Sequence, residues 1–164
     1  MKIIVAGEGA FGNKHLEALR AIPEIEVVAL VGGVAETTRA VAEKWRSPRW
    51  TLDLAEALAM PGVEAAILAT PTPIHAAQAT QCLRAGKHVL VEIPMADSLR
   101  DAEALVRLTE QTGLVGMVNH VRRFNPSHQW IKRRIASGEL RIQQLFAQIY
   151  FFRRTNLNAL GQPR

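Results

Sequence analysis

Short apolar runs alternate along the chain with longer stretches in which apolar residues recur every three or four positions. Apolar runs of this length are typical of buried strands, whereas the longer spacing is typical of amphipathic helices. The pattern predicts strands at residues 2–6, 26–31, 65–69, 88–92 and 114–118. It predicts helices at residues 11–20, 35–45, 53–59, 74–85 and 99–112. This alternation indicates an α/β fold, a doubly wound parallel sheet with helices on both faces.

The last forty or so residues follow a different pattern. Asn125, Pro126 and Ser127 are typical of a helix start, and Gly138 is expected to end that helix. Residues 140–152 then alternate imperfectly between apolar and polar, as a half-buried strand does. This strand has no evident partner in the parallel sheet. We therefore predict a first domain at residues 1–120 and, at 121–164, a linker helix and the first strand of a truncated α+β domain.

Three glycines follow the first predicted strand with the spacing GxGxxG, at Gly7, Gly9 and Gly12. In a dinucleotide-binding turn, the first glycine allows the tight turn, the second lets the backbone approach the pyrophosphate, and the third lets helix and strand pack closely. The phosphates would lie at the helix N-terminus, where Ala10 and Phe11 stand. The motif predicts a nucleotide-binding Rossmann domain, and a plain strand-to-helix turn is the alternative.

The end of the second predicted strand bears on which dinucleotide binds. NAD-binding domains usually carry an acidic residue there, which binds the ribose 2′-hydroxyl. Here Gly32 and Gly33 occupy that position, so no carboxylate is expected to repel a 2′-phosphate. Thr37, Thr38 and Arg39 follow, and their hydroxyl and guanidinium groups suit a phosphate. We therefore expect NADP to be favoured over NAD.

Composition limits the remaining function classes. The chain has 164 residues, of which 48% are hydrophobic, and these values suit a globular domain with a real core. The net charge of +5 comes from scattered basic groups without interleaved aromatic residues, so nucleic-acid binding is not expected. No apolar run could span a membrane and no secretory leader is evident, so we expect a cytoplasmic protein. Cys82 stands alone and no ligand spacing indicates a metal site.

Four segments at the predicted junctions together resemble a known family. They are GEGAFG at 7–12, ATPTPIH at 69–75, AGKHVLVEIP at 85–94 and VRRFNP at 121–126. In this order and spacing they are similar to the Gfo/Idh/MocA oxidoreductases, and the resemblance covers nearly the whole chain. It implies a Rossmann domain followed by a C-terminal domain on an open, mostly antiparallel sheet. When complete, that second domain would bind substrate and, because its apolar sheet edge needs covering, would form a homo-oligomer.

The resemblance also implies further cofactor contacts. In the family, the stretch after the strand at 65–69 lies along the cofactor, so Ala69, Thr70, Pro71 and His75 would face the dinucleotide. For His75, a structural position in the first turn of its helix is the alternative. Glu92 would help to position the nicotinamide ribose, with a surface charge at a strand end as the alternative.

The motif that contains Glu92 departs from the family pattern. Family members usually read Glu-Lys-Pro, and their lysine lies beside the nicotinamide and the substrate, but here Ile93 stands in its place. An alkyl side chain cannot transfer a proton, so a general base must come from elsewhere. His120 is the nearby histidine and thus the candidate, although it would also suit a structural place at a strand end. Pro94 fixes the chain direction in either case.

Within the family, EIPMADS, NHVRRFNPSHQW and RRTNLNALGQPR together resemble dehydrogenases that oxidise a cyclic hemiacetal to a pyrone dicarboxylate with NADP. A dicarboxylate suits planar guanidinium groups, so Arg122 and Arg123 are the expected substrate-binding residues. Solvated surface arginines are the alternative. We therefore expect an NADP-dependent oxidoreductase acting on a small hydroxy or lactol substrate. A nonenzymatic, truncated dinucleotide-binding module is the alternative.

Overall fold

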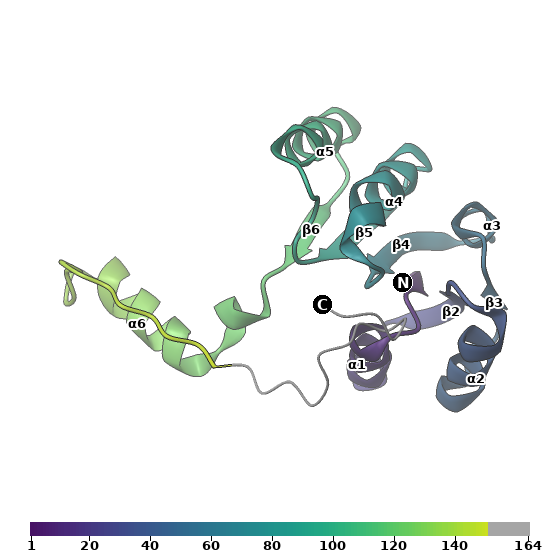
Figure 1. Ribbon diagram of the computed structural model, residues 1–164, viewed down its shortest axis with the longest axis horizontal. Helices are drawn as coiled ribbons and strands as arrows, with labels where there is room; N and C mark the ends of the chain where they lie inside the picture. Colours follow the sequence, from purple (N-terminus) through teal and green to yellow (C-terminus); the bar gives the residue numbers. More distant parts are fainter. Residues whose placement is uncertain (151–164) are drawn as a thin grey trace. The chain divides into compact units, whose positions relative to one another are not determined.

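The computed structural model describes residues 1–150, which include one six-stranded parallel sheet and its covering helices (Figure 1). The strands are β1 (Lys2–Ala6), β2 (Glu26–Val31), β3 (Trp50–Thr51), β4 (Val63–Leu68), β5 (His88–Glu92) and β6 (Gly116–Asn119). The helices are α1 (Ala10–Leu19), α2 (Ala35–Trp45), α3 (Leu54–Leu58), α4 (Thr72–Arg84), α5 (Leu99–Thr112), the short 3₁₀ helix η1 (Val121–Phe124) and α6 (Pro126–Ala136). The predicted α/β class with a doubly wound parallel sheet is confirmed.

The strand order is β3-β2-β1-β4-β5-β6, so the direction in which strands are added reverses at β1. Ala6 at the end of β1 pairs with Val31 on one side and with Leu68 on the other. The carboxyl ends of these three strands therefore lie side by side. Open α/β sheets bind ligands at such a reversal, beyond the carboxyl ends of the strands.

Helices cover both faces of the sheet because both faces of its strands are apolar. Alternate residues of a strand point to opposite faces, and neighbouring residues of β1 accordingly join different cores. Val5 packs with Leu16 of α1 and Ala42 of α2, whereas Ile4 belongs to a larger core with α3, α4 and α5. Figure 1 shows the same division, with α1 and α2 on one side and α3, α4 and α5 on the other. Burial on both faces explains why the strands read as continuous apolar runs.

Most predicted element boundaries lie within two residues of the observed ones. The exception in the sheet is β3, which the pattern did not predict because it consists of only Trp50 and Thr51. At α5 the local signals are clear: the Ser98 hydroxyl accepts a hydrogen bond from the Asp101 N–H, and Gly113 ends the helix with a φ of 65°. Helix α6 begins with Pro126 in its first turn, as predicted.

The strand expected at residues 140–152 is not formed in the part of it that the structure describes. Residues 140–150 have no strand assignment, and residues 151 and 152 lie outside the described residues. A strand needs a neighbour to satisfy its backbone groups, and residues 1–150 contain no strand of a second sheet. Leu145, Phe146 and Tyr150 are each more than three-quarters exposed. The strand predicted over residues 140–152 is therefore not formed within residues 140–150.

The chain divides into two compact units, Met1–Asn119 and His120–Arg164. The first contains the whole parallel sheet. In the described part of the second, η1 leads into α6, whose Arg134 guanidinium lies 4.3 Å from the centre of the Trp130 ring. Arg134 also forms an ion pair with Glu139 at 3.2 Å.

Candidate dinucleotide-binding site

The glycine turn between β1 and α1 is packed so closely that two of its glycines have no room for a side chain. Gly7 has a φ of 113°, and a Cβ atom there would lie 2.4 Å from the Ala69 carbonyl oxygen. A Cβ on Gly12 would lie 1.7 Å from the Gly7 carbonyl oxygen. A Cβ on Gly9, in contrast, would meet nothing within 4 Å. The first and third glycines thus serve close packing, while the second leaves its backbone open.

The N-terminus of α1 lies at this open backbone. Gly9 is the N-cap residue, no side chain caps the helix, and its first turn contains no acidic residue. Ala10 and Phe11 are exposed, Phe11 by 60%. A helix N-terminus favours anions through its free N–H groups and its dipole. The open backbone at Gly9 and this uncapped end fit the pyrophosphate of a dinucleotide.

The loop after β4 approaches the glycine turn, but His75, in the first turn of the following helix α4, is buried. Ala69, Thr70 and Pro71 lie between β4 and α4, and the Thr70 hydroxyl donates to Gln78 Oε1 at 2.6 Å. The side chain of His75 is only 1% exposed, and its ring nitrogens contact the carbonyl oxygens of Thr70 at 2.7 Å and Pro94 at 2.8 Å. His75 therefore fits the structural alternative and not a contact with the dinucleotide, because its ring is buried between two loops.

Glu92 lies in a hydrogen-bonded cluster at the ends of β5 and β6. Its Oε1 atom contacts His15 Nε2 of α1 at 2.7 Å and accepts from Asn119 Nδ2 at 2.5 Å. All three side chains are largely shielded, and the register of β5 and β6 places Glu92 opposite Asn119. Glu92 is therefore not a surface charge. Its carboxylate is held in one position by neighbours from α1 and β6.

Sequence reasoning missed the other two members of this cluster. His15 had the features of a surface helix residue, but its side chain is only 17% exposed because it points at Glu92. A weak signal was available, since His15 follows Gly12 by three residues and so lies near the same helix face.

Ile93, which follows Glu92 in the chain, is 48% exposed, and the Ile93–Pro94 peptide bond is cis.

The three residues expected to bind a 2′-phosphate have different environments. Thr38 is fully buried and its hydroxyl donates to the Val34 carbonyl oxygen at 2.6 Å. Thr38 does not suit the binding of a 2′-phosphate, because its hydroxyl faces the core. That hydroxyl is packed so closely against the backbone of Gly32 that a Cβ on Gly32 would lie only 1.9 Å from it. Thr37 is exposed and donates to the same carbonyl at 3.1 Å. Arg39 is exposed, and its pairing with Glu43 at 2.9 Å raises the pKa of its guanidinium.

A carboxylate occupies the start of α2, although none was expected there. Glu8, from the glycine turn, places Oε1 within 2.9 Å of the Gly33 N–H and 3.2 Å of the Val34 N–H. The Thr37 hydroxyl lies 3.5 Å from the same oxygen. The expectation that no carboxylate stands at this position is wrong, because the acid comes from another loop.

His120, Arg122 and Arg123 belong to the second unit. His120 precedes η1 as its N-cap residue, Arg122 and Arg123 lie within η1, and all three are exposed. The His120 carbonyl oxygen accepts from the Arg123 N–H at 2.9 Å, and the Arg122 carbonyl contacts His128 Nδ1 at 2.9 Å. Local backbone contacts thus bring the three residues together in one short helical turn.

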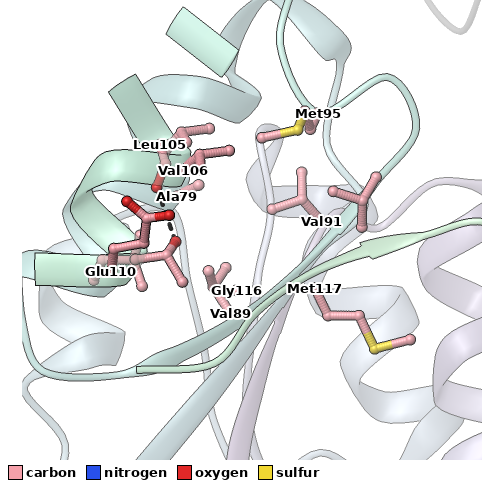
Figure 2. A pocket seen from close by; sticks show the side chains of 12 residues that line it. Ala79, Val89, Val91, Met95, Leu105, Val106, Glu110, Gly116 and Met117 are labelled. Carbon is pink, nitrogen blue, oxygen red and sulfur yellow. Dashed lines mark hydrogen bonds between the residues drawn. The ribbon is translucent and has the colours of Figure 1, made fainter. Parts of the chain in front are cut away.

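An apolar cavity of about 220 Å³ lies elsewhere in the first unit, between α4, α5, β5 and β6 (Figure 2). Its lining includes Val91, Met95, Leu105 and Met117, with Glu110 at one side. No residue of the glycine turn lines it. A dinucleotide needs hydrogen-bond donors for its phosphates, so this cavity does not fit the cofactor.

Residues 1–150 contain neither a candidate metal centre nor a candidate membrane span. These residues contain no group of three or more histidine, cysteine, aspartate or glutamate side chains placed to hold a metal ion. Within the same range, no helix is long and apolar enough to cross a membrane.

The parallel sheet, its reversal at β1 and the glycine turn together define a Rossmann domain. The chain belongs to the Gfo/Idh/MocA oxidoreductase family: its residues 1–120 match the family's NAD-binding Rossmann fold. Residues 126–164 match the C-terminal region of bacterial oxidoreductases. The resemblance noted from the sequence motifs is confirmed.

Individual relatives support the assignment. The chain is 54% identical over all of its 164 residues to 4-carboxy-2-hydroxymuconate-6-semialdehyde dehydrogenase of Sphingobium sp. strain SYK-6, covering 52% of that protein. It is 30% identical over 85% of its length to scyllo-inositol 2-dehydrogenase (NAD(+)) of Bacillus subtilis, covering 41% of it. The fold is also similar to that of biliverdin reductase from Synechocystis, crystallised with biliverdin and NADP⁺. The match covers 82% of this chain and 42% of the reductase chain, with 24% sequence identity and a TM-score of 0.74. The chain thus spans about half the length of the curated relatives named here.

Proposed function

We propose that this chain is the cofactor-binding part of an NAD(P)-dependent oxidoreductase. The observation that carries the proposal is the open backbone at Gly9, which lies at the uncapped N-terminus of α1. There the N–H groups of Ala10, Phe11 and Gly12 would bind the pyrophosphate. The loop at Ala69, Thr70 and Pro71 would border the bound dinucleotide. When bound, the nicotinamide accepts a hydride from the substrate.

For the substrate, we propose the cyclic hemiacetal of 4-carboxy-2-hydroxymuconate-6-semialdehyde, which would be oxidised to 2-pyrone-4,6-dicarboxylate. The 54% identity over the whole chain to a dehydrogenase of that name supports this choice. Oxidation removes a hydride from the carbon that bears the hydroxyl group and a proton from that hydroxyl. His120 would accept the proton, and Arg122 and Arg123 would bind the carboxylates. Such an enzyme would serve cytoplasmic aromatic catabolism.

Glu92 would orient the nicotinamide ribose. A carboxylate can accept hydrogen bonds from two ribose hydroxyls only if it is held in place. His15 and Asn119 both contact its Oε1 atom, which leaves Oε2 without a protein partner in the described residues. This arrangement supports a positioning role for Glu92, while Pro94 directs the chain away from the site.

For the cofactor, we propose NADP, with NAD as the alternative. Thr37 and Arg39 are exposed in the first half of α2, and both can contact a ribose 2′-phosphate. Both dinucleotides occur in the names of the similar proteins. Binding measurements with each cofactor decide between them.

One observation favours the nonenzymatic alternative. Ile93 replaces the lysine of the Glu-Lys-Pro motif, and an isoleucine cannot take part in proton transfer. In that case the chain would bind a dinucleotide without turning over any substrate. A homo-oligomer formed through a complete second domain is part of the enzymatic proposal and not of this alternative.

The test combines calorimetric titration of the full chain with activity measurements. We expect one dinucleotide per chain and slow reduction of NADP⁺ with the semialdehyde. A chain extended by the relative's second half should react much faster. Binding without turnover in the extended protein would support the nonenzymatic module, and absence of binding would contradict both proposals.

A further inference from the structure

The residue between the first two glycines of the turn, Glu8, reaches a second helix. Its carboxylate does not point toward α1, the helix that the glycine turn precedes. It lies at the start of α2, where Oε1 accepts from the N–H groups of Gly33 at 2.9 Å and Val34 at 3.2 Å. Val34 is the N-cap residue of α2, and no side chain of α2 itself caps this end. Glu8 therefore supplies an anionic cap from 25 residues away.

The position that Glu8 occupies matters because it is where Rossmann domains distinguish NAD from NADP. In NAD-binding domains a carboxylate at the end of β2 binds the ribose 2′-hydroxyl, and in NADP-binding domains basic groups bind the 2′-phosphate. Here the residues at the end of β2 are Gly32 and Gly33. A Cβ placed on Gly33 would lie 3.7 Å from Glu8 Oε1. The carboxylate thus stands at the place usually reached by a side chain from β2.

The residues around Glu8 leave its negative charge without a cationic partner. None of the ion pairs formed within residues 1–150 includes Glu8. Arg39, the basic residue in the first half of α2, pairs with Glu43 one turn further on. The partners of Glu8 are two backbone N–H groups and the Thr37 hydroxyl, and all of these are donors that a phosphate also uses.

We infer that Glu8 sets the preference of this chain between NAD and NADP. The inference rests on the proposed dinucleotide-binding function. The Glu8 carboxylate can accept a hydrogen bond from a 2′-hydroxyl, but a 2′-phosphate would compete with it for the Gly33 and Val34 N–H groups and be repelled by its charge. Glu8 therefore lowers the affinity for NADP relative to NAD, whereas Thr37 and Arg39 raise it. Removing the charge of Glu8 raises the affinity for NADP relative to NAD further.

The test measures binding of NAD⁺ and NADP⁺ to the full chain by calorimetry, with the Glu8→Gln variant. Glutamine keeps an oxygen that can accept from the two N–H groups, so α2 retains a cap while the charge is lost. We expect the ratio of NADP⁺ to NAD⁺ affinity to rise about tenfold, the change that follows from removing one close like-charge contact. Adenosine 2′,5′-bisphosphate, compared with AMP, should show the same shift because it contains the 2′-phosphate.

The matched control is Glu36→Gln. Glu36 lies in the first turn of α2, so this variant removes a charge at the same helix end without changing the group that contacts Gly33 and Val34. We expect it to leave the affinity ratio within about twofold of the wild-type value, since an exposed charge is screened. Equal ratios in wild type and Glu8→Gln, with both dinucleotides bound, would overturn the role of Glu8. Equal shifts in both variants would also overturn it, whereas failure of the wild type to bind either dinucleotide would overturn the proposed function.

Discussion

Two strand-to-helix turns of this domain look alike in sequence but differ in what they offer an anion. Both follow a buried strand, both contain glycines, and each leads into a helix of at least ten residues. The N-terminus of α1 has no cap and no acid in its first turn, so it is open to a phosphate. The N-terminus of α2 is capped by the Glu8 carboxylate. Whether a helix start can bind an anion therefore depends on what neighbouring loops place there.

The glycines of the first turn provide the largest expected effect. Gly12→Ala would place a methyl group 1.7 Å from the Gly7 carbonyl oxygen, so the turn must open. We expect a loss of about 3 kcal/mol or more in the free energy of unfolding. Gly9→Ala is the matched control, because its methyl group meets no protein atom and its φ of −73° suits alanine.

The control should lose less than about 1 kcal/mol, the usual cost of alanine in place of glycine at an N-cap. Urea denaturation of both variants measures the difference. Similar losses in the two variants would contradict the close packing of α1 against β1 at Gly12.

The two carboxylates of the site should differ in their effect on stability. Glu92→Ala leaves the shielded side chains of His15 and Asn119 without their acceptor, and we expect a loss of about 1–3 kcal/mol. Glu8→Ala removes a partly exposed cap, which water can replace, and we expect about 0.5–1 kcal/mol. Chemical denaturation of both variants checks this order, and a larger loss for Glu8→Ala would contradict it.

Cys82 lies in α4, on the face of the sheet opposite α1 and α2, and should make the stability depend on pH only in alkaline solution. Burial raises the pKa of its thiol from 9.0 to about 12. Because the fold favours the neutral thiol, this contribution to stability is complete below pH 9 and is lost as the pH rises from about 9 to 12.

The measurement compares wild type with Cys82→Ala in urea between pH 7 and 11. We expect the stability advantage of the wild type to be constant up to about pH 9 and to shrink above it. In the folded wild-type protein the thiol should also resist alkylation at pH 8. A constant advantage up to pH 11 would show that the thiol is not buried as described.

The parts of the molecule that the sequence predicted well are those with local causes. Strands buried on both faces read as apolar runs, and the roles of Gly7 and Gly12 follow from steric contacts within one short motif. The inward position of Thr38 was also within reach, because Thr38 and Ala42 are four residues apart on one helix face and both are buried. Treating the threonine only as a phosphate ligand overlooked that periodicity.

The missed features depend on contacts between distant segments. Glu8 and Gly33 are 25 residues apart, and His15 and Glu92 are 77 apart. No local pattern indicates which loop places a carboxylate at α2, nor that His15 turns toward the end of β5. Within residues 140–150 the expected strand is not formed for a related reason, since alternation shows that a segment suits a strand but not that a partner strand is present.

The central claim is that the open backbone at Gly9 and the N-terminus of α1 bind a dinucleotide. Calorimetric titration of the full chain and of its Gly9→Ala variant with NADP⁺ and NAD⁺ tests it most directly. We expect saturable binding of one dinucleotide per chain, weakened at least about tenfold in the variant while its urea unfolding stays close to that of the wild type. Equal affinities in the two proteins, or no saturable binding to the wild type, would contradict the claim.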